Sequence, residues 1–187
     1  LALIQLQRQS ANLAGALASA QAAVAALPDD PQIAEQLALL LQATGDRNQA
    51  VSAWRRLAAL PSLPAGMDLR VAEALRRLGA AADSQESVTA TLKADPGSLQ
   101  AHRAAATQAL QQGKPARALE WARQLQRRRP DEALGFELEG DAQAAQQQWS
   151  RAAAAYGKAL TRRNVGAAAV GLHASLLKSQ GPEQALR

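Results

Sequence analysis

Histidines and paired carboxylates are the side chains in this sequence best able to act in catalysis or to bind a metal. His102 and His173 are the only histidines among the 187 residues. They fall on different predicted helices, and we expect each to be a packed or half-exposed helix residue rather than a ligand or part of a proton relay. The carboxylate pairs at 29–30 and 131–132 each follow a proline. Acidic residues in that place are suited to capping the helix that follows.

Two further signals of enzyme chemistry are weak. Gly113-Lys114 is similar to the end of a phosphate-binding loop, but the glycine needed five residues earlier is Gln108, and no strand precedes it. The chain has no cysteine, which excludes disulfides and thiolate metal sites and leaves the compartment open. The sequence therefore predicts no catalytic residue, no metal site and no cofactor, and we expect the protein not to be an enzyme.

Arginine is the remaining side chain that could recognise a partner. The chain has a formal net charge of +5, and between residues 98 and 129 seven basic residues stand against Glu120 alone. Runs at 127–129 and 162–163 end predicted helices, where each cation interacts favourably with the helix dipole by about 0.3–1 kcal/mol. Arginine forks also suit carboxylate and phosphate groups, so a structural and a binding interpretation both stay open.

The elements that position these side chains follow from a fixed period. Glycines at 45, 79 and 113 are 34 residues apart, and Gly181 lies two such steps further on. A period of this length is typical of a solenoid in which one small helical unit is stacked repeatedly. No alternation of period two is long enough to indicate a strand.

Other columns keep the same step. If Gly45 is position 15 of a repeat, small residues at positions 8 and 20 let two helices approach closely. Glycine at 15 supplies the left-handed backbone that ends the first helix, and proline at 32 stops the second. Gln147 occupies position 15 in one unit, so we expect that helix to end without glycine. The other occupants are Ala38, Ala72, Ala106, Gly140 and Ala174 at position 8; Ala16, Ala50, Ser84, Ala118 and Ala152 at position 20; Ala20, Trp54, Val88, Ala122 and Tyr156 at position 24; and Pro28, Pro96 and Pro130 at position 32, with Pro61 one place early.

This pattern resembles the tetratricopeptide repeat, and the resemblance covers nearly the whole chain. It implies an all-α fold, a right-handed superhelical solenoid of antiparallel helix pairs in a single array. The turns within pairs are expected near 10–12, 44–47, 78–83, 112–115, 146–149 and 180–182. The units are expected at 1–30 (partial), 31–64, 65–98, 99–132, 133–166 and 167–187 (truncated). Because the first and last units are incomplete and lack polar capping helices, we expect a fragment of a longer bacterial repeat protein.

In the tetratricopeptide family the first helix of each pair lines a concave groove. Carried over, the groove columns give a set of candidate ligand-binding residues: Arg70, Glu73, Arg76, Arg77, Arg103, Thr107 and Asp141. The four arginines, from two adjacent units, would form a basic patch suited to an acidic peptide. The alternative is a solvated face with internal pairs, such as Arg70 with Glu73 or Glu73 with Arg77.

One stretch imitates a membrane signal. Residues 9–27 carry no charge and follow Arg8. Polar residues interrupt the stretch, and Ala16 and Ala20 keep the repeat positions. We therefore expect an ordinary second helix and no membrane span.

Three functions are compatible with the sequence. The resemblance implies a non-enzymatic protein-protein interaction scaffold that binds a peptide or a partner domain in its concave groove. Similar bacterial repeat proteins serve envelope assembly, secretion and exopolysaccharide export, which favours the periplasmic side of the envelope over the cytoplasm. The alternative is a structural, self-assembling solenoid or spacer that associates through its truncated ends. Nucleic-acid binding, suggested by the pI of about 10.4, is disfavoured because only 3% of residues are aromatic and the arginines are scattered along the sequence.

Overall fold

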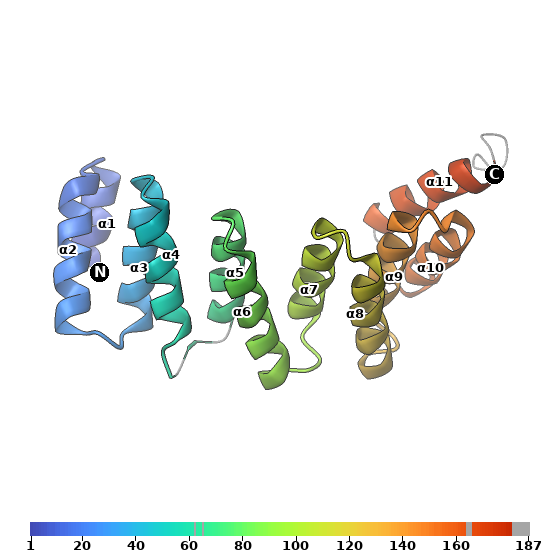
Figure 1. Ribbon diagram of the computed structural model, residues 1–187, viewed down its shortest axis with the longest axis horizontal. Helices are drawn as coiled ribbons and strands as arrows, with labels where there is room; N and C mark the ends of the chain where they lie inside the picture. Colours follow the sequence, from blue (N-terminus) through green and yellow to red (C-terminus); the bar gives the residue numbers. More distant parts are fainter. Residues whose placement is uncertain (62, 65, 164–165, 181–187) are drawn as a thin grey trace. The chain divides into compact units, whose positions relative to one another are not determined.

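The computed structural model describes residues 1–61, 63–64, 66–163 and 166–180, and within them every regular element is an α-helix (Figure 1). The chain forms two compact units, Leu1–Ala90 and Thr91–Arg187. The first unit contains α1 (Ala2–Gln9), α2 (Leu13–Ala26), α3 (Pro31–Ala43), α4 (Arg47–Ala58), α5 (Met67–Arg77) and most of α6 (Ala81–Ala94). The second contains α7 (Leu99–Gln111), α8 (Pro115–Arg128), α9 (Ala133–Ala145), α10 (Trp149–Arg162) and α11 (Gly166–Gln180).

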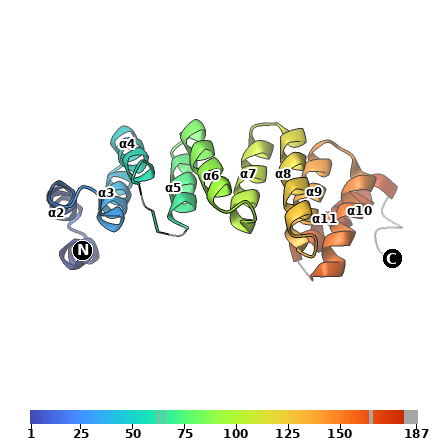
Figure 2. The ribbon, with the colours of Figure 1, turned by 90° about the horizontal axis from the view of Figure 1, so that it is seen from below.

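The helices alternate as the period predicts. Each predicted turn from 10–12 to 146–149 begins directly after a helix ends. The turn predicted at 78–83 is too long, because α6 already begins at Ala81, and the turns at 44–47, 112–115 and 146–149 each include the first residue of the next helix. The turn expected at 180–182 lies outside the described residues except at its first position. Helices α3 and α4, α7 and α8, and α9 and α10 pack as antiparallel pairs, and α9 lies between α8 and α10 (Figure 2). The expected all-α, tetratricopeptide-like fold of stacked helix pairs is confirmed.

The uncharged stretch after Arg8 is an ordinary helix. It forms α2, a second helix that buries Ala16, Ala20 and Val24. Across the described part of the chain, the helices lack the length and hydrophobicity that a membrane span requires.

Small residues at positions 8 and 20 are buried where the helices of a pair pack, although position 8 of the first pair is Ile4. Ala38, Ala106 and Ala118 are completely buried. In α6 the hydroxyl of Ser84, at position 20, donates a hydrogen bond of 2.7 Å to the carbonyl of Ala72, at position 8 of α5. The side chain of Ser84 on α6 therefore reaches the backbone of α5 directly. A longer side chain at position 8 or position 20 would hold these two helices apart. Ala174 departs from the column because it is exposed.

The turn that ends each first helix uses the left-handed backbone whether or not glycine is present. Gly45, Gly79 and Gly113 have φ values of 81°, 73° and 67°, whereas Ala11 and Gln147 occupy the same column with φ of 57° and 59°. After α9, the amide of Gln148 donates to the carbonyl of Gln143, and the amide of Gln147 donates to Ala144. These bonds satisfy the last carbonyls of the helix, so the geometry of the turn is imposed by the fold rather than by the residue.

Only one of the two predicted acidic caps forms. Asp30 caps α3, and its carboxylate accepts hydrogen bonds from the amides of Gln32 and Ile33. Glu132 stands at the corresponding place before α9 but makes no side-chain capping bond. The expectation for Glu132 is wrong: its extra methylene group carries the carboxylate away from the amides, and it lines a cavity instead.

Replacing Gln147 by glycine is expected to stabilise the protein. A residue with a Cβ pays roughly 1–2 kcal/mol for the left-handed conformation, and glycine loses part of this gain through its greater freedom in the unfolded chain. We expect the free energy of unfolding of Gln147→Gly to rise by about 0.5–1 kcal/mol in urea denaturation.

Gln146→Gly is the matched control, because Gln146 has φ of −90° and gains nothing from glycine. It should lose stability by roughly 0.5–1 kcal/mol. Equal effects of the two substitutions would show that the left-handed turn carries no cost.

Candidate functional site

The candidate groove arginines of the first unit form ion pairs with carboxylates. Arg70, on α5, reaches Glu35 on α3 with an N–O distance of 2.7 Å. Arg76 and Arg77 both bind Glu73, each at 2.8 Å. The hydrogen bond from Arg76 is the main reason why the pKa of Glu73 falls to about 2. The Glu73–Arg77 pair expected from helix spacing is present, but Arg70 pairs with Glu35 rather than with Glu73.

The arginine of the second unit is held more loosely. Arg103, on α7, has one guanidinium nitrogen 3.5 Å from the carboxylate of Glu137 on α9. More than half of the Arg103 side chain is exposed, whereas Glu137 is 5% exposed. A separation of 3.5 Å is at the long limit for a hydrogen bond. Arg103 is therefore the candidate arginine best placed to accept a new partner.

Thr107 and Asp141 complete the predicted set in the second unit. Thr107 is exposed on α7, one turn after Arg103. Asp141 is half-buried on α9, one turn after Glu137, and accepts a hydrogen bond of 2.7 Å from the hydroxyl of Tyr156 on α10. The predicted residues thus fall into two separate groups, Arg70 to Arg77 in the first unit and Arg103, Thr107 and Asp141 in the second.

Two glycines make room for Tyr156. A Cβ atom at Gly140, on α9, would lie 2.5 Å from Cε1 of the Tyr156 ring, and one at Gly171, on α11, would lie 2.6 Å from Cζ. The ring is 4% exposed, and its hydroxyl reaches Asp141. The absence of side chains at these two positions thus lets a second-helix residue hold a carboxylate on a first helix.

Burial dominates the electrostatics of this pair. It raises the pKa of Asp141, against the opposing effects of the Tyr156 hydrogen bond and the Arg103 charge. Burial also raises the pKa of Tyr156, and the bond to Asp141 adds to the rise, so the phenol remains a donor. The pKa of Asp141 is higher in the folded protein than in the unfolded chain. Its protonation therefore stabilises the folded protein at a pH below the unfolded pKa, and this stabilisation is lost as the pH rises through the folded pKa.

A cavity of about 460 Å³ lies beside Arg103. It is formed by α7, α9, the end of α10 and the start of α11, and it mixes apolar side chains, Leu99 and Leu134, with charged ones. Besides these two leucines it is lined by Gln100, Arg103, Glu132, Ala133, Glu137, Arg163 and Gly166.

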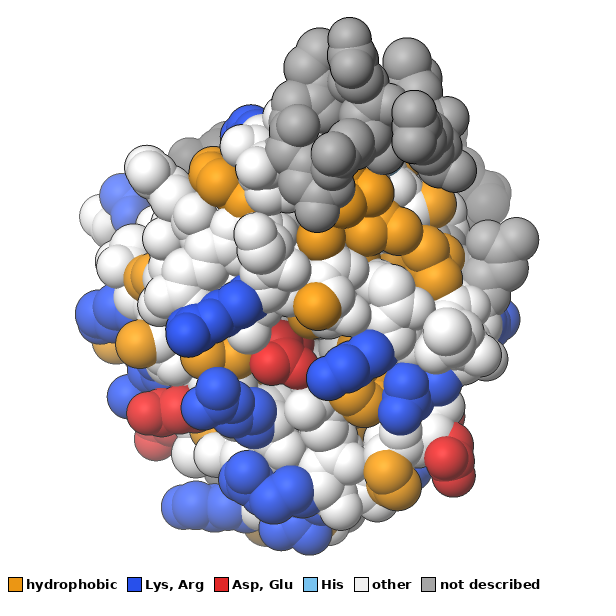
Figure 3. Space-filling model, turned by 90° about the vertical axis from the view of Figure 1, so that its right-hand side faces the viewer, with side chains coloured by type: hydrophobic (Ala, Val, Ile, Leu, Met, Phe, Trp, Pro, Cys, Tyr) orange, Lys and Arg blue, Asp and Glu red, His pale blue; other side chains and the backbone are white. Residues whose placement is uncertain are grey.

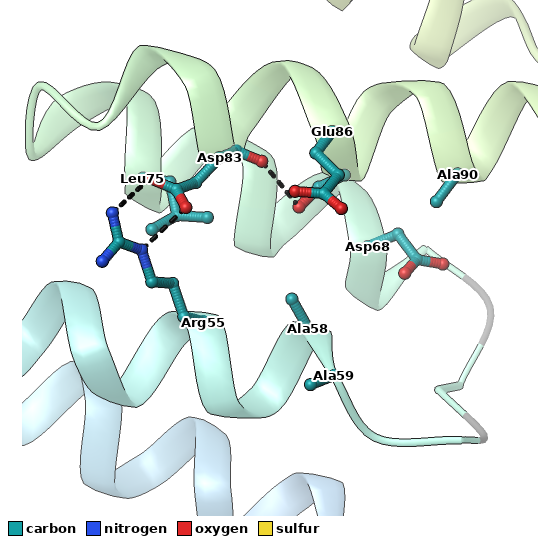
Figure 4. Close-up of a pocket in the computed structure, with 9 residues that line it drawn as sticks. Arg55, Ala58, Ala59, Asp68, Leu75, Asp83, Glu86 and Ala90 are labelled. Atoms are coloured by element: carbon teal, nitrogen blue, oxygen red, sulfur yellow. Dashed lines mark hydrogen bonds and ion pairs between the residues drawn. The ribbon is translucent and has the colours of Figure 1, made fainter.

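A second cavity, of about 340 Å³, lies in the first unit between α4, α5 and α6 (Figure 4). Arg55 binds Asp83 across it through two hydrogen bonds of 2.7 and 2.8 Å. The hydrogen bond from Arg55 lowers the pKa of Asp83. Asp68 and Glu86 also line this cavity, which therefore has an acidic character that the sequence did not reveal.

The two histidines lie on different helices, and only His102 is buried. His102 is 1% exposed, its Nδ1 lies 2.9 Å from the carbonyl of Ser98, and its ring meets Trp121 edge to face. His173 is exposed on α11. Within the described ranges, the side chains that commonly bind metals form no group of three or more.

Comparison with known proteins identifies the fold. No family model and no curated protein sequence matches the chain. Among solved structures, the C-terminal part of a tetratricopeptide-repeat protein from Cytophaga hutchinsonii is 13% identical, with a TM-score of 0.67 over 95% of this chain and 72% of that one. PilW, a type IV pilus biogenesis factor, is 17% identical, with a TM-score of 0.65 over 98% and 86%. MamA is 14% identical, with a TM-score of 0.65 over 86% and 87%.

These neighbours and the observed helix pairs define the class: the chain has the tetratricopeptide-repeat fold. At this level of identity the likeness concerns the fold alone.

Removing the Tyr156 hydroxyl tests the link between the second helix and Asp141. Tyr156→Phe keeps the ring in its slot but leaves the carboxylate without its donor, so we expect a loss of about 1.5–3 kcal/mol in urea denaturation at neutral pH. Asp141→Asn keeps a hydrogen-bond acceptor and removes the partly desolvated charge, so its loss of unfolding free energy should be smaller. The difference in stability between the original protein and Asp141→Asn should shrink as the pH rises and Asp141 ionises. Equal losses for both variants at all pH values would contradict this assignment.

Proposed function

We propose that the protein is a non-enzymatic protein-interaction scaffold. The first-helix face of its second unit, formed by α7 and α9, binds a peptide or a loop of a partner domain. The observation that carries this proposal is the cavity beside Arg103, where leucines and a loosely paired arginine lie together. Its volume is within the range of roughly 300–1,000 Å³ found for ligand sites.

The cavity suits one apolar side chain of a peptide with an acidic neighbour. Leu99 and Leu134 offer apolar contact, and Arg103 offers guanidinium donors that Glu137 only partly uses. Thr107, exposed one turn further along α7, extends the polar rim. A partner carboxylate could form the short, paired hydrogen bonds with Arg103 that Glu137 does not make.

In the first unit an acidic partner has to compete with carboxylates already in place. Arg70 and Arg77 are more than half exposed despite their pairing with Glu35 and Glu73. Exposed ion pairs contribute only about 0–1 kcal/mol, so the exchange of one carboxylate for another is not costly. We therefore retain Arg70, Glu73, Arg76 and Arg77 as a secondary contact surface.

A role in a bacterial envelope, secretion or exopolysaccharide assembly belongs to the same proposal. Its support is the expectation from the repeat pattern together with the likeness to PilW, which is described as a type IV pilus biogenesis factor.

Exposed apolar side chains favour self-association as a second candidate. In the first unit, Leu3, Leu6 and Leu27 are 55–62% exposed, and in the second unit Val170 is 71% exposed. Such side chains are sites where a second copy could pack. Light scattering at high concentration separates the two candidates, because a scaffold for other proteins can remain a monomer.

The scaffold proposal is tested with a peptide selected from a random display library on the 187-residue protein. We expect the selected peptides to carry an acidic residue beside an apolar one. Arg103→Glu should weaken their binding by about tenfold or more in calorimetric titration, because a reversed charge in the contact costs roughly 2 kcal/mol or more.

Arg123→Glu is the matched control, since it makes the same change of charge on an exposed residue of α8, away from the cavity. It should change the affinity less than about threefold, by long-range charge alone. Selected peptides that bind Arg103→Glu and Arg123→Glu equally well would refute the site.

A further inference from the structure

The net positive charge of the protein belongs to its second unit. Residues 1–90 contain seven basic and eight acidic residues, whereas residues 91–187 contain fourteen basic and eight acidic ones. The first unit also pairs its arginines internally, as Arg55 does with Asp83 and Arg70 with Glu35. The excess charge of the second unit therefore needs an explanation of its own.

That excess lies on the second helices. We call the exposed cations on α8, α10 and their end residues the second-helix face: Lys114, Arg117, Arg123, Arg127, Arg128, Arg129, Arg151, Lys158, Arg162 and Arg163. Glu120 is the only acidic residue in 114–129 and 148–163. Three carboxylates of the unit, Glu137, Glu139 and Asp141, lie on α9. The helices α8 and α10 therefore differ in charge from α9, which packs between them.

Three cations of the second-helix face, Lys114, Arg151 and Arg162, bond to neutral groups. Lys114 bonds to the side-chain oxygen of Gln112, and Arg151 bonds to that of Gln148. Arg162 donates to the carbonyl of Pro130 and lies 3.8 Å over the ring of Phe136. Among the described residues, no carboxylate forms an ion pair with any of these ten cations. Their charge is therefore uncompensated within the described chain.

The same repeat positions carry arginine in both helices. Three arginines of α8 and its end recur one repeat of 34 residues later on α10 and its end: Arg117 as Arg151, Arg128 as Arg162, and Arg129 as Arg163. The bond from Arg162 to Pro130 places the end of α10 against the turn that follows α8. Each helix has 14 residues and is about 21 Å long, so the cations are spread over a broad surface. Figure 3, which shows the right-hand side of the view in Figure 1, has Lys and Arg side chains in blue over much of the lower part of this face.

We propose that the second-helix face binds the surface of a membrane rich in anionic lipids. A flat bilayer can meet cations spread over two helices at once, and each basic residue near an anionic surface contributes about 1 kcal/mol. The large hydrophobic side chains that are exposed in the described chain lie on α1, α2 and α11 and beside them, not on α8 or α10. Binding is therefore electrostatic and peripheral, without insertion of apolar side chains. Apart from Arg163, which also lines the cavity beside Arg103, the residues proposed for the protein partner do not belong to the second-helix face.

Single-stranded nucleic acid fits this face less well. Such ligands bind through aromatic platforms on which bases stack. Trp121, on α8, is half-buried and packs against His102 and Arg117, and Trp149, on α10, lies under the ammonium group of Lys178 at 4.1 Å. Tyr156 is buried. The aromatic rings of these helices are thus already in use.

Co-sedimentation with vesicles tests the proposal. We expect the protein to bind phosphatidylcholine vesicles that contain phosphatidylserine, at physiological ionic strength, and not to bind vesicles of phosphatidylcholine alone. The quadruple variant Arg117→Gln, Arg123→Gln, Arg127→Gln and Arg128→Gln should lose affinity by about tenfold or more. The corresponding Arg→Lys variant should bind like the original protein, because charge rather than geometry is recognised.

A control variant removes the same number of charges from exposed residues of the first unit through Arg8→Gln, Arg47→Gln, Arg55→Gln and Arg56→Gln. It should retain affinity within about twofold, and circular dichroism should show both Gln variants folded. An equal loss in both Gln variants, or equal binding to the two kinds of vesicle, would overturn the proposal. So would retention of DNA or of an acidic protein by the original chain without any binding to anionic vesicles.

Discussion

The close approach of helices through small side chains is the constraint on which the rest of this structure depends. In α5 and α6 the serine at position 20 meets position 8 of the preceding helix, as the bond from Ser84 to the carbonyl of Ala72 shows directly. Ala118 and Ala106 share one buried cluster at the same positions of α8 and α7. At this separation the turn between the helices has little freedom. Gln147 and Ala11 consequently accept the left-handed backbone that glycine provides elsewhere.

Tight, regular stacking also decides which charges can meet. Arg103 and Glu137 are 34 residues apart and so occupy the same position of successive first helices, whereas Glu35 and Arg70, 35 residues apart, occupy neighbouring positions. The second helices of the second unit repeat arginine at the same positions instead, and like charges accumulate there. One period thus produces a first-helix face with compensated charge, suited to selective contacts, and a second-helix face with uncompensated charge, suited to an extended anionic surface.

The sequence predicted the helices well because the period, the small columns and the turn glycines all depend on local geometry. The site was harder to predict. The groove columns selected Arg103, which lies on α7 beside a cavity. The partners of the arginines were sought within one helix, and a search one repeat away would have found Glu35 and Glu137. The slot for Tyr156 depends on Gly140 and on Gly171 together, so its shape required the packed structure.

The thermal and urea stability of Ala106→Leu, compared with Ala104→Leu, tests most directly whether position 8 controls the helix approach. Ala106 is completely buried against α8, whereas Ala104 is half-buried on the same helix. Overpacking costs about 1–3 kcal/mol, so Ala106→Leu should lose that much while Ala104→Leu loses less than about 0.5 kcal/mol. Equal losses for the two variants would contradict the account.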